Sequence, residues 1–247
     1  MLVGALIGSW ILLGTVPLLI ELAAGLLAPG LFYAGACLTS AIVALAIGSS
    51  WTTAGTIGVA LIGAAGLLDL DAAVTAGAVI SGAYFGDKLS PLSDTTNLAS
   101  ASAGADLFDH IAYMLRTSIP ALAVALVLFL FLGGADANRA PELASVSRLL
   151  PEGLLPRTLL LLPLATLFGL SLLRVPAIMT LFVGIVVAAG LCLLVERPLT
   201  GLLAAELGGD PLTVWRALFE GVRFDSGSEA VDALLSRGGM SSMLGTI

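Results

Sequence analysis

The sequence predicts an all-α membrane protein, a polytopic helix bundle with discontinuous or re-entrant helices. Of its 247 residues, 58% are hydrophobic and only 11% are charged, and the mean hydropathy is +1.08, whereas about a quarter of the residues in a soluble domain are charged. Its apolar runs approach the roughly 20 residues that a helix needs to cross a bilayer. They lack the alternation of polar and apolar residues that is typical of transmembrane β-barrels, so helices are the expected spanning elements.

Long apolar runs mark the expected spanning helices. These helices are expected at residues 1–20, 31–47, 110–132, 158–173 and 176–195. The turn sequence Pro29-Gly30 separates the first two, and Asp106 is positioned to cap the start of the third.

Two shorter apolar stretches, residues 54–68 and 72–85, differ from these long runs because glycines and hydroxyl side chains interrupt them. A hydroxyl-rich break, residues 49–53 (SSWTT), precedes the first stretch, and the acidic turn at residues 69–71 separates the two. Truncated hydrophobic segments of this kind are the best sequence indication of discontinuous helices around a binding site within the membrane.

The chain is expected to form a single transmembrane domain, residues 1–247, with an extramembrane connection at residues 133–157. That connection holds Arg139, Arg148 and Arg157, whereas residues 1–87 contain no lysine or arginine. Basic loops stay on the cytoplasmic side, so a multi-pass protein of the cytoplasmic (inner) membrane is expected. Both ends of the polar region near residue 90 then face one side, which favours a re-entrant hairpin. The abrupt apolar start and end of the chain indicate a partial domain.

A polar island at residues 87–97 interrupts the apolar sequence. Its polar members are Asp87, Lys88, Ser90, Ser93, Asp94, Thr95, Thr96 and Asn97. Polar and ionisable side chains between membrane segments are expensive to bury and commonly functional. A solvated surface loop is the alternative interpretation of the same pattern.

The segment around the island resembles a known family. Residues 81–99 (SGAYFGDKLSPLSDTTNLA), together with residues 48–58 (GSSWTTAGTIG) and residues 236–239 (SRGG), are similar to the pattern of NhaC-type sodium/proton antiporters. The resemblance implies secondary active antiport by alternating access, with Na⁺ and H⁺ as transported ions and no resident cofactor. Members of that family are longer, so the chain resembles their middle part.

The residue chemistry of the island suits a sodium site. A hard cation binds several oxygen ligands, and Asp94, Thr95 and Asn97 are the expected sodium ligands. Asp87, Ser93 and Thr96 are expected to complete the ion-binding set. Pro91 prevents a continuous helix and frees backbone carbonyl groups. Burial disfavours the charged form of a carboxyl group, so one buried aspartate can hold either a proton or a sodium ion.

Four further side chains are second-tier candidates, each with a structural alternative. Ser50, Thr52 and Thr53 are potential hydroxyl ligands, but such side chains also bond to helix carbonyls one turn back. Lys88, the chain's single lysine, is either a counter-charge in the site or an anchor at the membrane interface. The lone histidine, His110, is expected at the interface rather than in a proton relay.

Two other functions stay open. One is sodium- or proton-coupled exchange of an organic acid of the malate/lactate type, for which Lys88, Arg237 or the backbone at Gly238-Gly239 would anchor a carboxylate. The other is a non-autonomous fragment that needs a complementary subunit. The expected partners are the lipid bilayer, the two ions and either a second copy or that subunit.

Two function classes are disfavoured. The net charge of -7 and the lack of a basic patch argue against nucleic-acid binding. The chain contains neither a phosphate-binding loop nor a hydrolase motif, so an enzyme is not expected.

Overall fold

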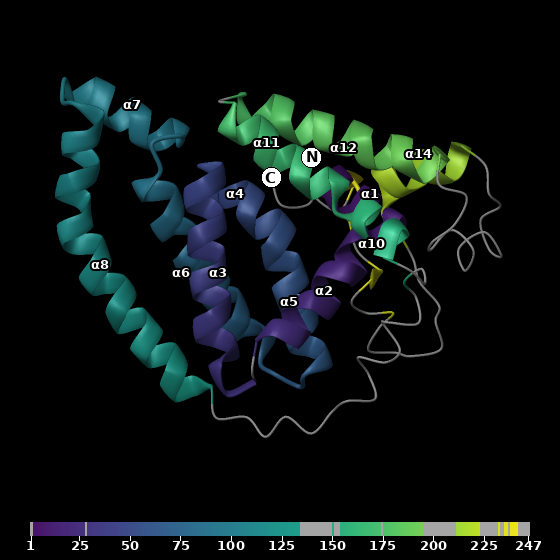
Figure 1. Ribbon diagram of the computed structural model, residues 1–247, viewed down its shortest axis with the longest axis horizontal. Coiled ribbons are helices and arrows are strands. Elements are labelled where there is room, and N and C mark those ends of the chain that lie inside the picture. The colour runs from purple at the N-terminus through teal and green to yellow at the C-terminus, as the bar shows by residue number, and fades with distance from the viewer. Residues whose placement is uncertain are drawn as a thin grey trace. The chain divides into compact units, whose positions relative to one another are not determined.

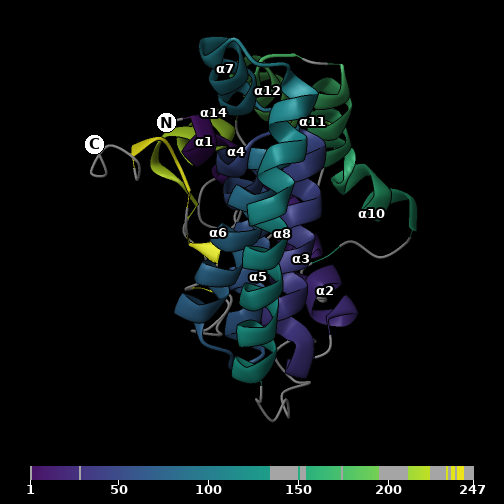
Figure 2. The ribbon, with the colours of Figure 1, turned by 90° about the vertical axis from the view of Figure 1, so that its left-hand side faces the viewer.

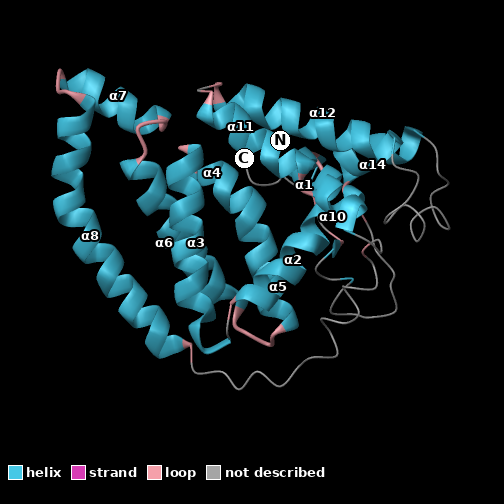
Figure 3. Ribbon diagram, in the orientation of Figure 1, coloured by secondary structure: helices cyan, strands magenta, loops and turns pink. Residues whose placement is uncertain are grey.

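The computed structural model describes residues 2–27, 29–133, 150, 154–173, 175–194, 211–222, 232, 235, 236 and 238–241. Within these ranges every regular element is a helix, as Figure 3 shows, which confirms the predicted all-α class. Most of the expected extramembrane connection at residues 133–157 lies outside the described residues, and so does Arg237. The described part of the chain forms two compact units, and each is presented by itself.

The first unit, Met1–Ala23, Arg139–Gly169 and Ile178–Ile247, begins with a broken helix rather than the single span expected at residues 1–20. Helix α1 (Leu2–Leu13) and helix α2 (Thr15–Leu26) are bent by 80°. Gly14 lies between them with a φ of +95°, a backbone conformation that glycine adopts without strain. The expected spanning segment at residues 1–20 is therefore bent at Gly14 instead of forming one straight helix.

The remaining described helices that contribute to this unit are α10 (Leu154–Leu160), α11 (Leu162–Leu172), α12 (Ala177–Leu194) and α14 (Pro211–Glu220). The Thr15 hydroxyl donates to the carbonyl of Leu160 at 2.7 Å. The Gly239 amide donates to the carbonyl of Gly4 at 2.8 Å, so the glycine pair at residues 238–239 packs its backbone directly on α1. The helices expected at residues 158–173 and 176–195 correspond to α10 with α11 and to α12.

The second unit, Ala24–Asn138 and Leu170–Ala177, holds the polar island. After the short 3₁₀ turn η1 (Pro29–Leu31), helix α3 runs over Phe32–Ile47. The next helix is made of α4 (Ser50–Thr53), the π-helical turn η2 (Ala54–Gly58) and α5 (Val59–Leu67). The hydroxyl-rich segment is thus the start of a helix and not a break. The break lies just before it, at Gly48, where φ is +74°.

Three further helices complete this unit: α6 (Ala72–Leu89), α7 (Asp94–Ala103) and α8 (Leu107–Leu132). Helix α6 extends four residues beyond the predicted apolar stretch and so carries the start of the polar island. Asp106 caps α8 as predicted, because its carboxylate accepts from the amides of Phe108 and Asp109 at 2.8 and 3.2 Å.

Two helices in the described part of the chain, Ser50–Leu67 and Leu107–Leu132, are long and apolar enough to cross a membrane, and the bent pair α1–α2 would be a third span. Helix α8 has no buried residue, and its exposed side chains include Val124, Leu128 and Phe131. An apolar surface of this extent suits a hydrocarbon environment rather than water.

Helices α3 and α6 lie side by side along their length (Figures 1 and 2), because glycines on α6 allow the backbones to approach. A Cβ atom added at Gly82 would collide with the backbone of Cys37, and one at Gly86 would collide with the Ala41 carbonyl and lie 2.6 Å from the Leu45 nitrogen. Two small residues four positions apart are typical of close helix packing in membranes. This packing sets the position of the end of α6, where the polar island begins.

We expect Gly86→Ala to destabilise the second unit by about 1–3 kcal/mol, because the new methyl group forces α3 and α6 apart. Gly77→Ala is the matched control on the same helix, since a Cβ there meets nothing within 4 Å and alanine favours helix formation. Thermal unfolding in detergent measures both. Equal melting temperatures for the two variants would contradict this packing.

Candidate functional site

The polar island is a helix interruption held in place by its own side chains. Helix α6 ends at Leu89, and α7 begins at Asp94. Between them, the Ser90 hydroxyl donates to the carbonyl of Leu45 on α3 at 2.7 Å, and the Ser93 side chain caps α7 by accepting from the Thr96 amide at 3.4 Å. Pro91 lies in this turn and has no amide hydrogen to continue a helix. The helix is therefore discontinuous at the position that the sequence predicted.

A second helix interruption, the one at Gly48, contacts the first. A Cβ atom at Gly48 would lie 2.7 Å from the carbonyl carbon of Leu92, so only glycine permits this approach of the two backbones. Ser49 follows Gly48 and caps the next helix by accepting from the Thr52 amide at 3.3 Å. The start of α4 is consequently placed beside the end of α6.

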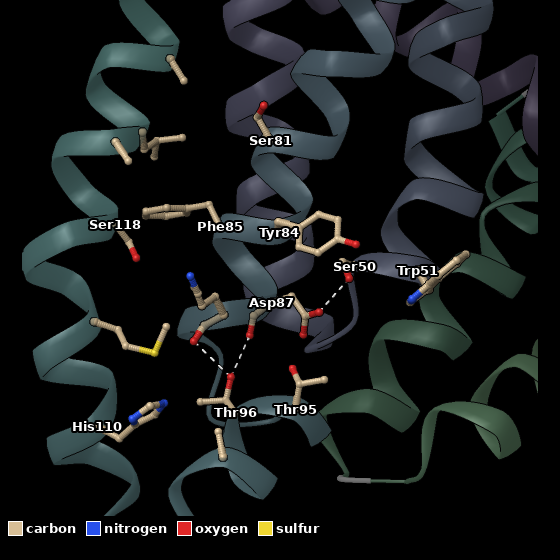
Figure 4. A pocket seen from close by; sticks show the side chains of 16 residues that line it. Ser50, Trp51, Ser81, Tyr84, Phe85, Asp87, Thr95, Thr96, His110 and Ser118 are labelled. Atoms are coloured by element: carbon tan, nitrogen blue, oxygen red, sulfur yellow. Dashed lines mark hydrogen bonds between the residues drawn. The ribbon is translucent and has the colours of Figure 1, made fainter.

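Asp87 lies where these two helix ends meet. Its half-buried side chain accepts a hydrogen bond of 2.7 Å from the hydroxyl of Ser50 (Figure 4). Asp87 is in the last turn of α6, where the partial negative charge of the helix terminus favours a cation. The carboxylate thus lies in a setting that favours a positive ion.

Thr95 and Thr96 bring hydroxyl groups to the same place from α7. The buried Thr96 hydroxyl donates to the carbonyls of Asp87 and Lys88, at 3.3 and 3.1 Å, and so ties α7 to the end of α6. The Thr95 hydroxyl lies 2.9 Å from the hydroxyl of Ser93. Figure 4 shows the Thr95 side chain beside the Asp87 carboxylate, with its oxygen directed toward that group.

These groups form one end of a pocket of about 700 Å³ within the second unit. Four helices line it: α4, α6, α7 and α8. The residues that line it are Ser50, Trp51, Ser81, Tyr84, Phe85, Asp87, Lys88, Thr95, Thr96, Ala99, His110, Met114, Ser118, Ala121, Leu122 and Ala125. The wall formed by α8 is mainly apolar, whereas the oxygen-bearing side chains gather around Asp87.

The structure brings some of the expected ion ligands to the pocket and leaves others outside it. Thr95, Thr96 and Asp87 line it, but Asp94 is exposed at the start of α7 and does not. Asn97 is also exposed, and its amide nitrogen donates to the carbonyls of residues 91 and 93, each at 2.8 Å. Of the three expected sodium ligands, Thr95 is therefore the one that reaches the pocket, and direct roles for Asp94 and Asn97 stay predictions.

The second-tier candidates divide in the same way. Ser50 and Lys88 line the pocket. The Thr52 hydroxyl instead donates to the Ser49 hydroxyl at 3.0 Å, and the Thr53 hydroxyl donates to the Ser49 carbonyl at 2.9 Å. Thr53 thus makes the bond to a backbone carbonyl that was the alternative interpretation, whereas Thr52 bonds to the side chain that caps the helix. The Ser93 hydroxyl is likewise used as a helix cap.

Sequence reasoning missed the contribution of α8 to the pocket. His110, Met114, Ser118 and Leu122 all line it and follow one another at intervals of four residues. Residues four apart lie on the same face of a helix. This spacing was the available signal, but the apolar composition of the segment indicated only a spanning helix.

Comparison with known proteins gives a family and several relatives. The model of the Na⁺/H⁺ antiporter family matches residues 82–247. The chain is 38% identical over 251 residues to the Na⁺/H⁺ antiporter NhaC of Alkalihalophilus pseudofirmus, covering 100% of this chain and 51% of that protein. It is 37% identical over 247 residues to the arginine/ornithine antiporter ArcD of Halobacterium salinarum, covering 98% and 49%.

A further relative is the malate-2H⁺/Na⁺-lactate antiporter of Bacillus subtilis, which is 32% identical over 250 residues, covering 99% of this chain and 51% of that protein. The chain spans about half the length of the curated relatives it matches. No solved structure matches the chain significantly.

We expect Thr96→Val to loosen α7, because the variant keeps the side-chain shape but loses the hydroxyl that bonds to the end of α6. Loss of a hydrogen bond of this kind costs about 1 kcal/mol, which corresponds to roughly fivefold faster hydrogen exchange of the α7 amides if they exchange by local opening. Thr96→Ser retains the hydroxyl and serves as the control. Unchanged α7 exchange in Thr96→Val, with α3 as internal reference, would refute the role of this bond.

Proposed function

Because the chain belongs to the Na⁺/H⁺ antiporter family, we propose that it carries the ion site of a secondary transporter that exchanges Na⁺ for H⁺ across the cytoplasmic membrane. Family membership indicates a transporter rather than an enzyme. The single observation that supports the proposal best is the carboxylate of Asp87, which lies at the end of an interrupted helix and is bonded to Ser50 in a pocket.

The chemistry of this arrangement suits competition between two cations. A sodium ion needs several oxygen ligands, and the Asp87 carboxylate with the hydroxyls of Ser50 and Thr95 supplies the first of them. Carbonyl groups at the end of an interrupted helix add further oxygens in known carriers. A proton on the carboxylate removes the charge that attracts sodium. One carboxyl group therefore binds either cation but not both, and this exclusivity is the requirement for antiport.

The exchange would follow alternating access, in which the site opens to one side of the membrane at a time. The relatives are about twice as long as this chain, so we propose that the complete transporting unit includes further helices. These would come from the rest of a longer chain, from a complementary subunit or from a second copy.

Exchange of an organic acid is a second candidate function. One relative is a malate-2H⁺/Na⁺-lactate antiporter, and the pocket volume of about 700 Å³ exceeds what a sodium ion fills. Lys88 in the pocket lining would pair with a substrate carboxylate. Counterflow of labelled malate in proteoliposomes separates this function from ion exchange, and labelled arginine belongs in the same assay because of the arginine/ornithine relative.

We expect Asp87→Asn to reduce sodium-dependent proton flux at least about 100-fold, since the amide neither carries the exchanged proton nor neutralises the sodium ion. A pH-sensitive dye in everted vesicles measures the flux. The same assay on Asp94→Asn tests whether the exposed carboxylate at the start of α7 also binds the ion, as the sequence predicts.

Asp71→Asn is the matched control for this experiment. It removes one carboxylate from the opposite end of α6, where Asp71 caps the helix by accepting from the Ala73 and Val74 amides at 2.7 and 3.0 Å, and asparagine caps helices equally well. Its flux should match that of the unmodified protein. Full flux in Asp87→Asn, with equal membrane insertion of all variants, would exclude Asp87 as the exchanging group.

A further inference from the structure

The wall of the pocket formed by α8 carries an imidazole side chain. His110, the chain's single histidine, is half-buried and lines the same pocket as Asp87. Figure 4 shows its imidazole ring projecting from α8 toward α6 and α7. Histidine is the side chain that most readily changes its charge within the physiological pH range. The sequence alone indicated an interfacial residue here, and its place in the pocket lining is therefore informative.

The charged and titratable groups around His110 come from two helices. Helix α6 brings Asp87, Lys88 and the phenol of Tyr84 to the pocket, whereas α4 and α7 bring only uncharged side chains to its lining. On α8 itself, Asp106 and Asp109 precede the histidine and Arg116 follows it. The Asp106 carboxylate is engaged as the helix cap.

These charges act on the imidazole in opposite directions. Lys88 and the N-terminus of α8 contribute positive charge around the imidazole, while Asp109, Asp106 and Asp87 contribute negative charge. The contribution of Asp87 differs from the others because that charge disappears whenever Asp87 binds a cation. A change in charge on one wall of a pocket acts on a titratable group on another wall, and the effect exceeds that in bulk water where protein rather than water fills the space between them.

We propose that His110 is a second proton-binding residue of the pocket, and that the charge on Asp87 controls its protonation. The inference rests on the proposed function, because sodium is the cation that would neutralise Asp87. When sodium binds at Asp87, the imidazolium of His110 releases its proton to water in the pocket. When sodium leaves, the imidazole takes a proton from water. No other bond is made or broken. The pocket then contains two groups that bind protons and one site that binds sodium.

The single histidine makes a direct test practical, because all imidazole signals in a nuclear magnetic resonance spectrum of the protein belong to His110. The protein is ¹⁵N-labelled at histidine, placed in detergent and titrated with acid and base in NaCl or in choline chloride at equal ionic strength. The variants are Asp87→Asn and, as the matched loss of one carboxylate on α6, Asp71→Asn. Asp87→Ser is a second charge-removing variant in case the asparagine variant does not fold.

Asp87→Asn should move the midpoint of the imidazole titration to lower pH by on the order of half a unit, because the imidazolium loses an attractive charge. Sodium should also move this midpoint to lower pH in the unmodified protein and in Asp71→Asn. In Asp87→Asn, sodium should leave the midpoint unchanged. The titration of Asp71→Asn in choline chloride should match that of the unmodified protein.

Equal midpoints in the unmodified protein and in a folded Asp87→Asn or Asp87→Ser variant would overturn the proposed coupling, whatever sodium does. A second outcome is that removal of the Asp87 charge shifts the imidazole midpoint while sodium leaves the midpoint of the unmodified protein unchanged. That result supports the coupling between the two residues and contradicts the sodium site at Asp87, and with it the proposed function.

Discussion

The hydrogen bond from Ser50 to Asp87 is the interaction on which the functional account depends, because it joins two helix interruptions that are far apart in the sequence. Ser50 begins a helix just after the left-handed Gly48, and Asp87 lies in the last turn of a helix that ends before Pro91. A polar interaction between two partly buried groups specifies geometry more than it adds net stability. Here it places the oxygen atoms of the two side chains next to each other within an otherwise apolar helix bundle.

That geometry is a consequence of backbone packing. The glycines at positions 82 and 86 bring α6 against α3, and Gly48 at the end of α3 contacts the turn that follows α6. Each of these contacts is between backbones and leaves no room for a side chain. The carboxylate is consequently positioned by main-chain contacts, which change less readily than flexible side chains do, and Thr96 then fixes α7 to the same helix end.

Much of this arrangement was predictable from local sequence. Composition identified the membrane class, Asp106 marked a helix start, and the polar residues around Pro91 marked the helix interruption, because each of these signals acts over a few neighbouring residues. The path of the first twenty residues was not predictable, since a glycine within an apolar run is compatible with both a straight and a bent helix. The hydroxyl-rich segment was misread for a similar reason, as Ser and Thr are typical of loops and of helix starts alike.

The choice among the ion ligands required tertiary structure. The sequence favoured Asp94 over Asp87 as a sodium ligand, but the turn between them directs Asp87 into the pocket and leaves Asp94 exposed. His110 was assigned to the membrane interface because its neighbours along the chain are charged, and only the packing of α8 beside α6 brings it into the pocket lining. Long-range contacts of this kind are not encoded in any short pattern.

Infrared difference spectroscopy tests most directly the central claim that a proton and a sodium ion compete for Asp87. The purified protein in lipid is recorded with and without sodium over a series of pH values. The account predicts that sodium removes the carbonyl band of a protonated carboxyl group, that rising proton concentration restores it, and that Asp87→Asn lacks this band change. A sodium-induced loss of the band that persists in Asp87→Asn, or no band change in the unmodified protein at any pH, would contradict the account.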